Sequence, residues 1–212
     1  MSLHKIFTYW EGPKPEYIGM CQDSLNKHCR NDFEIFNFCD CHNPNNLKIN
    51  HKVDVLKANL VLENGGFWID ADMIVMQSLL PLIKLVERHG FIGFPGFFGA
   101  KKGNRLLQDW VKAMDKIVST ELSFADLIQP LLSNKKYKGY QYLTREMSTP
   151  IWHTRDEFWK LFKDLPLKEY VTKKTYVFTL YNSQFSKEFK EMSREAILEK
   201  DWLISKVFRE SL

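Results

Sequence analysis

The sequence predicts an α/β fold in which helices flank a mostly parallel central sheet. Short runs rich in β-branched and aromatic residues alternate with segments whose apolar residues recur every three or four positions. The order strand, helix, strand is already present in the first forty residues and favours a parallel sheet. The 212 residues, 44% of them hydrophobic, are enough for a single domain over 1–212. Two small lobes, or one module of a longer protein, remain alternatives.

The first three elements follow from residue type and spacing. The β-prone run HKIFTYW, His4–Trp10, ends at the Gly/Pro breaker EGPKP and predicts a buried strand. Apolar residues at helical spacing predict a helix over Glu16–Cys29. The segment Phe33–Phe38 has the β-branched and aromatic character of a second strand.

A second helix and a central strand come next. The spacing predicts a helix over His51–Asn64, with Gly65 as its left-handed stop. The run GFWI, Gly66–Ile69, predicts a short central strand, and Met73–Met76 a further extended segment. The residues expected to face inward from the helix are Val53, Leu56 and Leu60.

The remaining elements carry weaker patterns. The segment Phe91–Ala100 predicts a strand region broken by Gly and Pro, and Asn104–Val118 predicts a helix. Further predicted elements are helices over Thr120–Leu132, Asp156–Leu165 and Lys187–Phe208, and a late strand at Lys174–Tyr181.

Charge and hydropathy narrow the class of protein. The net charge is only +4 and no long run of one sign occurs, so a nucleic-acid-binding surface is not expected. No apolar run approaches the ~20 residues that cross a bilayer, and the first residues lack a secretory-signal pattern. We therefore expect a cytoplasmic protein without a transmembrane segment.

The cysteines point to free thiols. A cytoplasmic setting argues against a disulfide framework among the four, which are Cys21, Cys29, Cys39 and Cys41. The run CDCH, Cys39–His42, is the alternative of a zinc site, but C-x-C-H lacks the usual paired spacing.

Two aspartates directly follow the predicted central strand. If the chain stays extended, Asp70 and Asp72 project to the same side of it. Such a pair favours a hard divalent cation such as Mg²⁺ or Mn²⁺, with substrate phosphate completing its ligands. The alternative is a plain polar turn, since D-x-D is a common tripeptide. The carboxyl end of a strand, where ligands gather in open α/β sheets, favours the cation.

Three segments resemble one known family, the capsular polysaccharide synthesis proteins and related glycosyltransferases with a DXD sugar-binding region. Ile6–Cys29 is similar to the opening strand, Trp-x-Gly turn and first helix of that family. Lys52–Leu79 is similar to its pattern S-D-x-x-R, then L-x-x-x-G-G-x-[YW]-x-D-x-D, and Phe97–Leu107 is a weaker third match. The resemblance covers roughly the first half of the chain and implies a GT-A type fold.

The resemblance also implies the residues of a donor site. Asp70 and Asp72 match the DXD pair, which would be catalytic and would bind Mn²⁺ or Mg²⁺ on the donor diphosphate. Asp54 and Lys57 match a helix pair that faces the donor, although the family more often has Arg at the second position. A lysine meets phosphate as a point charge without the bidentate fork of arginine. The alternative for both residues is a solvated helix face.

Two further groups of residues are candidates for the same site. Thr8, Tyr9 and Trp10 match the strand end that holds the nucleoside, where a ring could stack on the base; the alternative is that Tyr9 or Trp10 is core. A late loop often completes a GT-A metal and phosphate site. Asn182 and Ser183 in LYNSQFS are candidates there, and His153 is another.

The implied activity is transfer of a sugar from a nucleotide-sugar donor, expected to be a UDP-sugar, to a hydroxyl of a surface glycan or glycoprotein glycan. The resemblance favours retention of anomeric configuration. A metal-dependent phosphohydrolase or nuclease also uses paired aspartates, but usually needs more ligands for a second metal. A non-catalytic carbohydrate-binding module is the third possibility, with the scattered aromatic residues as its platform.

Overall fold

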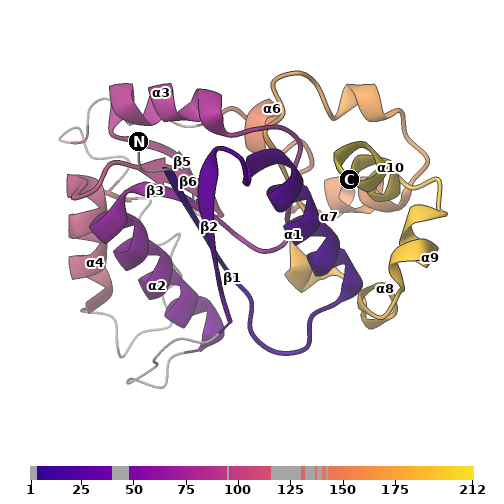
Figure 1. Cartoon of the computed structure of the whole chain (residues 1–212). Helices are drawn as coiled ribbons and strands as arrows, with labels where there is room; N and C mark the ends of the chain where they lie inside the picture. Colours follow the sequence, from indigo (N-terminus) through magenta and orange to yellow (C-terminus); the bar gives the residue numbers. More distant parts are fainter. Residues whose placement is uncertain are drawn as a thin grey trace. The chain divides into compact units, whose positions relative to one another are not determined.

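The computed structural model describes residues 4–39, 48–94, 96–115, 130–131, 137, 140–141 and 143–212, and it divides into two compact units. Unit 1 consists of Met1–Trp10, Phe33–Asp70 and Pro81–Tyr142, and unit 2 of Glu11–Asp32, Ala71–Leu80 and Leu143–Leu212. Figure 1 labels helices and strands of both units. The expected single glycosyltransferase domain stays a prediction.

Unit 1 contains a five-stranded sheet in the order β2-β1-β3-β6-β5. Its strands are β2 (Phe33–Phe38), β1 (His4–Tyr9), β3 (Gly66–Ile69), β6 (Phe97–Ala100) and β5 (Phe91–Phe94). β1 pairs in parallel with β2 and β3, and β6 pairs antiparallel with β3 and β5. Four strands therefore run in one direction and β6 in the other, which confirms the predicted mostly parallel sheet.

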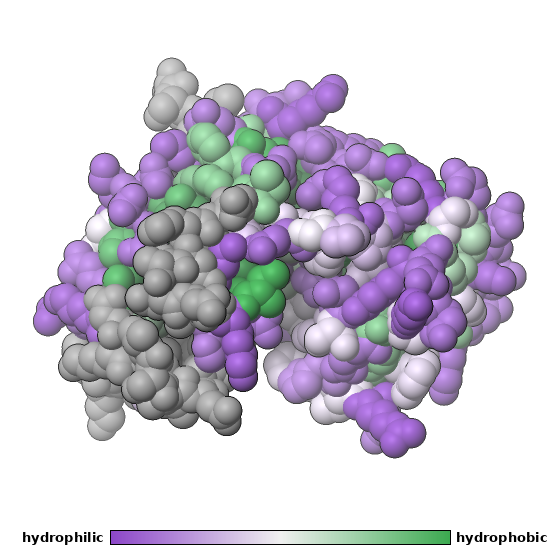
Figure 2. Space-filling view, turned by 90° about the horizontal axis from the view of Figure 1, so that it is seen from below, coloured by the Kyte–Doolittle hydropathy of each residue, from purple (hydrophilic) through white to green (hydrophobic). Residues whose placement is uncertain are grey.

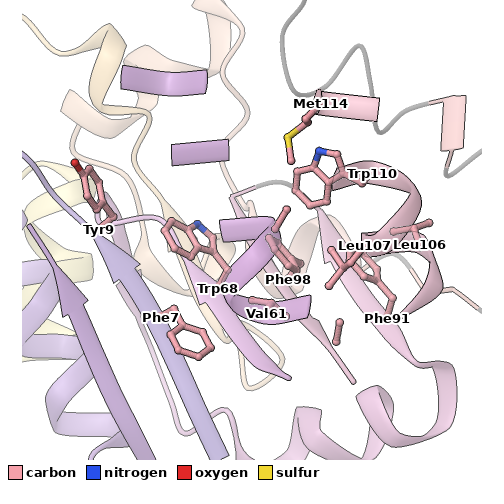
Figure 3. Packing of buried hydrophobic residues seen from close by; sticks show 12 residues of the cluster. Phe7, Tyr9, Val61, Trp68, Phe91, Phe98, Leu106, Leu107, Trp110 and Met114 are labelled. Carbon is pink, nitrogen blue, oxygen red and sulfur yellow. The ribbon is translucent and has the colours of Figure 1, made fainter. Parts of the chain in front are cut away.

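Strand β3 places large side chains on both faces of the sheet, because successive residues of a strand point to opposite sides. Phe67 stacks on Phe97 at 6.0 Å between ring centroids and packs edge-on against Phe33, also at 6.0 Å. Trp68 is fully buried on the other face, in a cluster with Phe7 and Phe98 (Figure 3). The strand is thus held by packing from two sides.

Helices α2 (Ile49–Asn64) and α4 (Arg105–Asp115) pack on each other and cover the Trp68 face (Figure 1). The predicted inward residues of α2, Val53, Leu56 and Leu60, are partly buried and pack against the hydrophobic cluster of unit 1. The residues of this helix with the least exposure are Lys52, Lys57, Ala58 and Val61. Two lysines, which the apolar spacing did not predict to be buried, therefore also lie on the buried side of the helix.

Helix α3 (Leu80–His89) was not among the predicted elements. Its buried residues, Leu82 and Val86, are four positions apart and give it one apolar stripe. Val86 lies over Gly99 of β6, on the Phe67 face of the sheet. The absence of a side chain at Gly99 makes room for Phe67 and Val86 to meet.

The two glycines at the start of β3, Gly65 just before it and Gly66 as its first residue, have different roles in the backbone. Gly65 ends α2 with a φ of +71°, and its N–H donates to the carbonyl of Val61 at 2.8 Å, as expected for a helix stop. Gly66 has a φ of +105°, and a Cβ there would lie only 2.3 Å from the carbonyl oxygen of Lys5. Gly66 therefore permits the close approach of β3 to β1.

Unit 2 is organised around α1 (Glu16–Cys29) and a two-stranded antiparallel sheet of β4 (Met73–Val75) and β7 (Val177–Thr179). The N–H of Val75 donates to the buried hydroxyl of Ser24 at 2.9 Å, which fixes β4 to α1. The extended segment predicted after the aspartates is confirmed as β4. The late strand predicted at Lys174–Tyr181 is confirmed over its central residues.

The helices of the C-terminal region are shorter than predicted. The single helix expected over Lys187–Phe208 is wrong. Ser186 and Ser193 each accept a hydrogen bond from the N–H three residues later, so each begins a new short helix. The helix expected over Asp156–Leu165 is also wrong, because α7 gives way to a 3₁₀ helix that ends before Pro166. The α-helices of this region are α6 (Arg145–Ser148), α7 (Arg155–Phe158), α8 (Lys187–Lys190), α9 (Arg194–Leu198) and α10 (Leu203–Ser211).

The 3₁₀ helices of unit 2 are η2 (Trp159–Phe162), η3 (Leu167–Glu169) and η4 (Asn182–Gln184). Some predictions fall outside the described residues: most of the helix at Thr120–Leu132, the end of Asn104–Val118, and Cys41 and His42 of the alternative zinc site. The described cysteines, Cys21, Cys29 and Cys39, are free thiols, as predicted.

The described surface is largely hydrophilic on the face shown in Figure 2, with hydrophobic residues visible in separate patches. The large hydrophobic residues with the most exposure are Ile49, Leu80, Trp152 and Trp159. Over the described ranges, every helix is too short or too polar to cross a lipid bilayer.

Replacing Gly66 by Ala should destabilise unit 1 by at least about 3 kcal/mol, because the new methyl would meet backbone that cannot move without breaking the β1–β3 pairing. Gly103→Ala is the matched control. Gly103 also has a positive φ, +71°, but a Cβ there would meet nothing within 4 Å. Only the backbone cost of about 1–2 kcal/mol is expected for it. Urea unfolding of both variants measures the difference, and equal losses would contradict the close-approach argument.

Candidate functional site

The two aspartates lie directly after β3. The N–H of Asp70 donates to the carbonyl of Gly96 at 2.8 Å, which extends the hydrogen bonding of β3 by one residue. A turn begins at Ala71 and includes Asp72. The expectation of an extended chain through both aspartates is therefore wrong, and each carboxylate is held by its own set of partners.

The Asp70 cluster consists of Asp70, Trp68, Lys57 and Asp54, all in unit 1. The indole N–H of Trp68 donates to Oδ1 of Asp70 at 2.6 Å. These two residues are two positions apart, so a strand directs both to one side. Burial raises the pKa of Asp70, and the positive charge of Lys57 and the Trp68 hydrogen bond partly offset that rise.

Lys57 and Asp54 form a buried ion pair one helical turn apart on α2. Lys57 Nζ lies 2.7 Å from Asp54 Oδ1, and the two side chains are only 6% and 14% exposed. Burial raises the pKa of Asp54, against the lowering effect of Lys57. The alternative of a solvated helix face is contradicted for both residues. Their predicted contact with a donor stays a prediction.

The Asp72 cluster consists of Asp72, Asn182, Tyr181 and Tyr17, all in unit 2. The backbone N–H of Asn182 donates to Oδ2 of Asp72 at 2.7 Å. The N–H of Leu180 donates to the carbonyl of Asp72 at 3.0 Å. Two N–H groups of the segment after β7 thus bind one aspartate, and the late loop predicted to lie near the DXD motif does contact Asp72.

Two members of the Asp72 cluster are tyrosines. The hydroxyl of Tyr17 donates to the side-chain oxygen of Asn182. Burial, together with the negative charge of Asp72, raises the pKa of Tyr17 well above its usual value, so the phenol stays protonated. Burial likewise raises the pKa of Tyr181 to about 12, although a hydrogen bond with Thr149 acts in the opposite direction.

Neither tyrosine was among the predicted site residues. Tyr17 is one of the residues at helical spacing that predict α1, and it is buried. The hydroxyl contact joins residues 165 positions apart, and no local pattern encodes it. Trp68 was predicted only as a strand anchor. Its two-residue spacing from Asp70 was the available signal for the hydrogen bond between them.

The predicted nucleoside-binding residues lie at the end of β1. Thr8 is 2% and Tyr9 is 5% exposed, and Tyr9 belongs to the core cluster beneath α2. The ammonium of Lys52 lies over the Tyr9 ring, 5.6 Å from its centroid. Trp10 is half-buried, and its backbone N–H donates to the carbonyl of Phe38. Of the three, Trp10 has the most accessible side chain.

The other predicted ligands lie near Asn182. The ring of His153 packs against Tyr181 at 5.7 Å between centroids, and its carbonyl accepts a hydrogen bond from Gln184. Ser183 is exposed in η4. The structure therefore brings Asn182 to Asp72, and places His153 beside the same turn through Tyr181 and Gln184.

The donor atoms suit a hard cation with few protein ligands. Among the residues that the structure describes, no three His, Cys, Asp or Glu side chains are grouped to hold a metal. The DXD motif offers one carboxylate in each unit, and in unit 2 the backbone N–H of Asn182 binds that of Asp72. Mg²⁺ and Mn²⁺ accept such a set when water and substrate phosphate supply the other oxygens.

Comparison by sequence finds no match: no protein-family model and no curated protein matches the chain. Comparison by structure finds glycosyltransferases. The apo form of the glycosyltransferase GlyE of Streptococcus pneumoniae TIGR4 aligns over the whole chain with a TM-score of 0.60 and 13% identity. The chain spans 60% of the length of that protein.

Two other solved structures match over nearly their full length. A glycosyltransferase involved in glycosylation of the major capsid of PBCV-1 aligns with 89% of this chain and 97% of its own, at a TM-score of 0.60 and 10% identity. The galactosyltransferase LgtC aligns with 98% of this chain and 94% of its own, at a TM-score of 0.51 and 12% identity. The chain therefore shares the α/β fold of these enzymes, and the predicted GT-A type fold is confirmed.

Replacing Lys57 by Met should destabilise the metal-free protein by about 3 kcal/mol at pH 7, because it leaves buried carboxylates without their cation. The loss should shrink as the pH falls. Folding raises the pKa of Asp54 and of Asp70. The folded state is therefore favoured below the pKa that each group has in the unfolded chain, and this contribution to stability is lost as the pH rises through the pKa of the folded state. Because Lys57 lowers the pKa of both carboxyl groups, its removal makes the loss of stability with rising pH larger. Urea unfolding between pH 4 and pH 7 in the presence of EDTA measures it.

Lys112→Met is the matched control, since Lys112 is an exposed residue of helix α4 in the same unit. It should change stability by less than about 0.5 kcal/mol at either pH. A Lys57→Met protein that loses no more stability than the control would show that the ion pair does not compensate the buried carboxylates.

Proposed function

We propose that this protein is a metal-dependent glycosyltransferase that moves a sugar from a UDP-sugar to a hydroxyl of a surface glycan or glycoprotein glycan. One observation carries the proposal: in a chain with the GT-A type fold, two carboxylates follow the central strand β3 directly. Fold alone does not determine activity, so the argument rests on the residues at that strand end.

Asp70 and Asp72 would hold the divalent cation, with Asn182 as a third oxygen donor. The surroundings of Asp70 favour this assignment, because burial makes its ionised form unfavourable and a cation would stabilise it. When bound, the cation supplies Lewis-acid stabilisation of the charge that develops on the leaving diphosphate. We assign contacts with the donor phosphates or sugar to Ser183, which follows Asn182 in the chain, and to His153, whose ring packs against Tyr181.

The residues of unit 1 bind and orient the donor. The group of Lys57, Asp54 and Asp70 suits a hydroxyl-rich ligand, because its carboxylates can accept hydrogen bonds from sugar hydroxyls. We assign base stacking to Trp10 instead of Tyr9, since the Tyr9 ring is buried and already has Lys52 over it. Thr8, also buried, supports the end of β1 from within.

The reaction proposed is substitution at the anomeric carbon. The bond from that carbon to the diphosphate oxygen breaks, and a bond to the acceptor oxygen forms through an oxocarbenium-like transition state. The nucleoside diphosphate leaves with the bonding electron pair, and its leaving oxygen takes up the proton that the acceptor hydroxyl loses. No described carboxylate is assigned as base or nucleophile.

Incubation with a panel of nucleotide sugars, Mn²⁺ and simple saccharide acceptors should release nucleoside diphosphate, most from a UDP-sugar. Release of inorganic phosphate instead would indicate the phosphohydrolase alternative. Binding of saccharides without release of either product would indicate the carbohydrate-binding alternative.

Asp72→Asn tests the site within the same assay. The amide oxygen still accepts the N–H of Asn182, so stability should stay near that of the wild type, while the loss of one ligand charge should reduce turnover at least about 100-fold. Asp201→Asn, the same change at an exposed position of unit 2, should keep full activity. Full activity in Asp72→Asn would remove the DXD motif from the mechanism.

We further propose that the anomeric configuration of the donor is retained, as the sequence resemblance implies. A proton NMR time course of the anomeric signals should show the retained anomer as the first product. Prior appearance of the opposite anomer would establish inversion.

A further inference from the structure

The Asp72 cluster is built by a backbone conformation that few residues adopt. Tyr181 has φ +58° and ψ +64°, and it is the one non-glycine residue with a positive φ among those that the structure describes. This left-handed conformation costs a residue with a Cβ about 1–2 kcal/mol. Strained conformations of this kind concentrate at functional sites and persist only where surrounding contacts hold them.

The strained residue lies between the two N–H groups that bind Asp72. Leu180 donates to the Asp72 carbonyl and Asn182 donates to its carboxylate, at 3.0 and 2.7 Å. The left-handed turn at Tyr181 changes the chain direction between these two donors. Without that turn the segment would continue the direction of β7, and the two N–H groups would not both meet Asp72.

Tyr17 holds this turn from the opposite side. Its side chain is fully buried, with Phe185 at 5.2 Å and Phe189 at 5.4 Å between ring centroids. The ring packing fixes the place of the hydroxyl, which donates to the side-chain oxygen of Asn182. Asn182 is thus held at its side chain by Tyr17 and at its backbone by Asp72.

We propose that Tyr17 is a positioning residue of the cation site. Its hydroxyl holds the strained turn at residues 180–182, and this turn fixes the carboxylate of Asp72. Tyr17 acts through Asn182 and makes no contact with substrate. The inference rests on the proposed function, because it takes Asp72 as a ligand of the cation.

Tyr17→Phe is the direct test, because it removes only the hydroxyl and keeps the ring packing against Phe185 and Phe189. Mn²⁺ alone is titrated into each protein, and the free ion is followed by its electron paramagnetic resonance signal. We expect Tyr17→Phe to bind Mn²⁺ about 3–10-fold more weakly than the wild type, the range of one lost hydrogen bond. Tyr170→Phe, the same change at a half-buried tyrosine elsewhere in unit 2, should bind as the wild type does.

Hydrogen exchange gives a readout that does not depend on the metal. In the metal-free Tyr17→Phe protein, the peptide 180–186 should exchange about 3–10-fold faster than in the wild type. Exchange over β4 and α10 should be unchanged, which separates release of the turn from general loosening of unit 2. Uniformly faster exchange across the unit would overturn the positioning role and leave only a packing role.

Asn182→Ala provides a second test, alone and combined with Tyr17→Phe in a double variant. It removes the same hydrogen bond from the acceptor side and retains the backbone N–H that binds Asp72. If the inference holds, the Mn²⁺ affinity of the double variant should equal that of Asn182→Ala alone, because the hydroxyl then has no acceptor. Independent, additive losses would overturn the inference.

The outcomes separate this inference from the proposed function. Wild-type Mn²⁺ affinity in Tyr17→Phe, together with loss of Mn²⁺ binding in Asp72→Asn, would reject the role of Tyr17 and leave the cation site in place. Wild-type affinity in Asp72→Asn would reject the cation site itself, and this inference with it.

Discussion

The pairing of β3 between β1 and β6 is the constraint on which the rest of unit 1 depends. The strand is only four residues long, yet it pairs on both edges and packs on both faces. The edge toward β1 allows no side chain at Gly66, where the Lys5 carbonyl occupies the space. A strand held in this way has a fixed end, so the residue that follows it, Asp70, has a defined position. A carboxylate on a mobile loop would have no such position.

Each aspartate of the DXD motif has a separate electrostatic environment. Asp70 is buried near a second carboxylate, Asp54, and both are stabilised by the positive charge of Lys57, while Asp70 alone accepts the hydrogen bond of the Trp68 indole. Asp72 is bound by backbone N–H groups of the turn after β7. A single residue separates the two aspartates in the chain, yet each carboxylate has its own hydrogen-bond partners.

The structural matches and the local chemistry make different contributions to the functional argument. At 10–13% identity the likeness to GlyE, the PBCV-1 enzyme and LgtC establishes the fold. The assignment of sugar transfer depends on the oxygen donors at the end of β3 and on the buried charge of Lys57 beside them. The solvated-face alternative for α2 would have weakened that assignment, and the burial of Lys57 and Asp54 contradicts it.

The sequence by itself determined the elements with strong local patterns: β1, α1, β2 and β3, the stop at Gly65, and the position of the aspartates after a central strand. Apolar periodicity and glycine conformation are local properties, so the residues alone express them. The burial of Lys52 and Lys57 on α2 and the breaks between α8, α9 and α10 were decided by packing and by serine caps within the folded chain. Only the tertiary structure brought Tyr17 and Asn182 to Asp72, because hydrogen bonds between distant residues leave no periodic signal in the sequence.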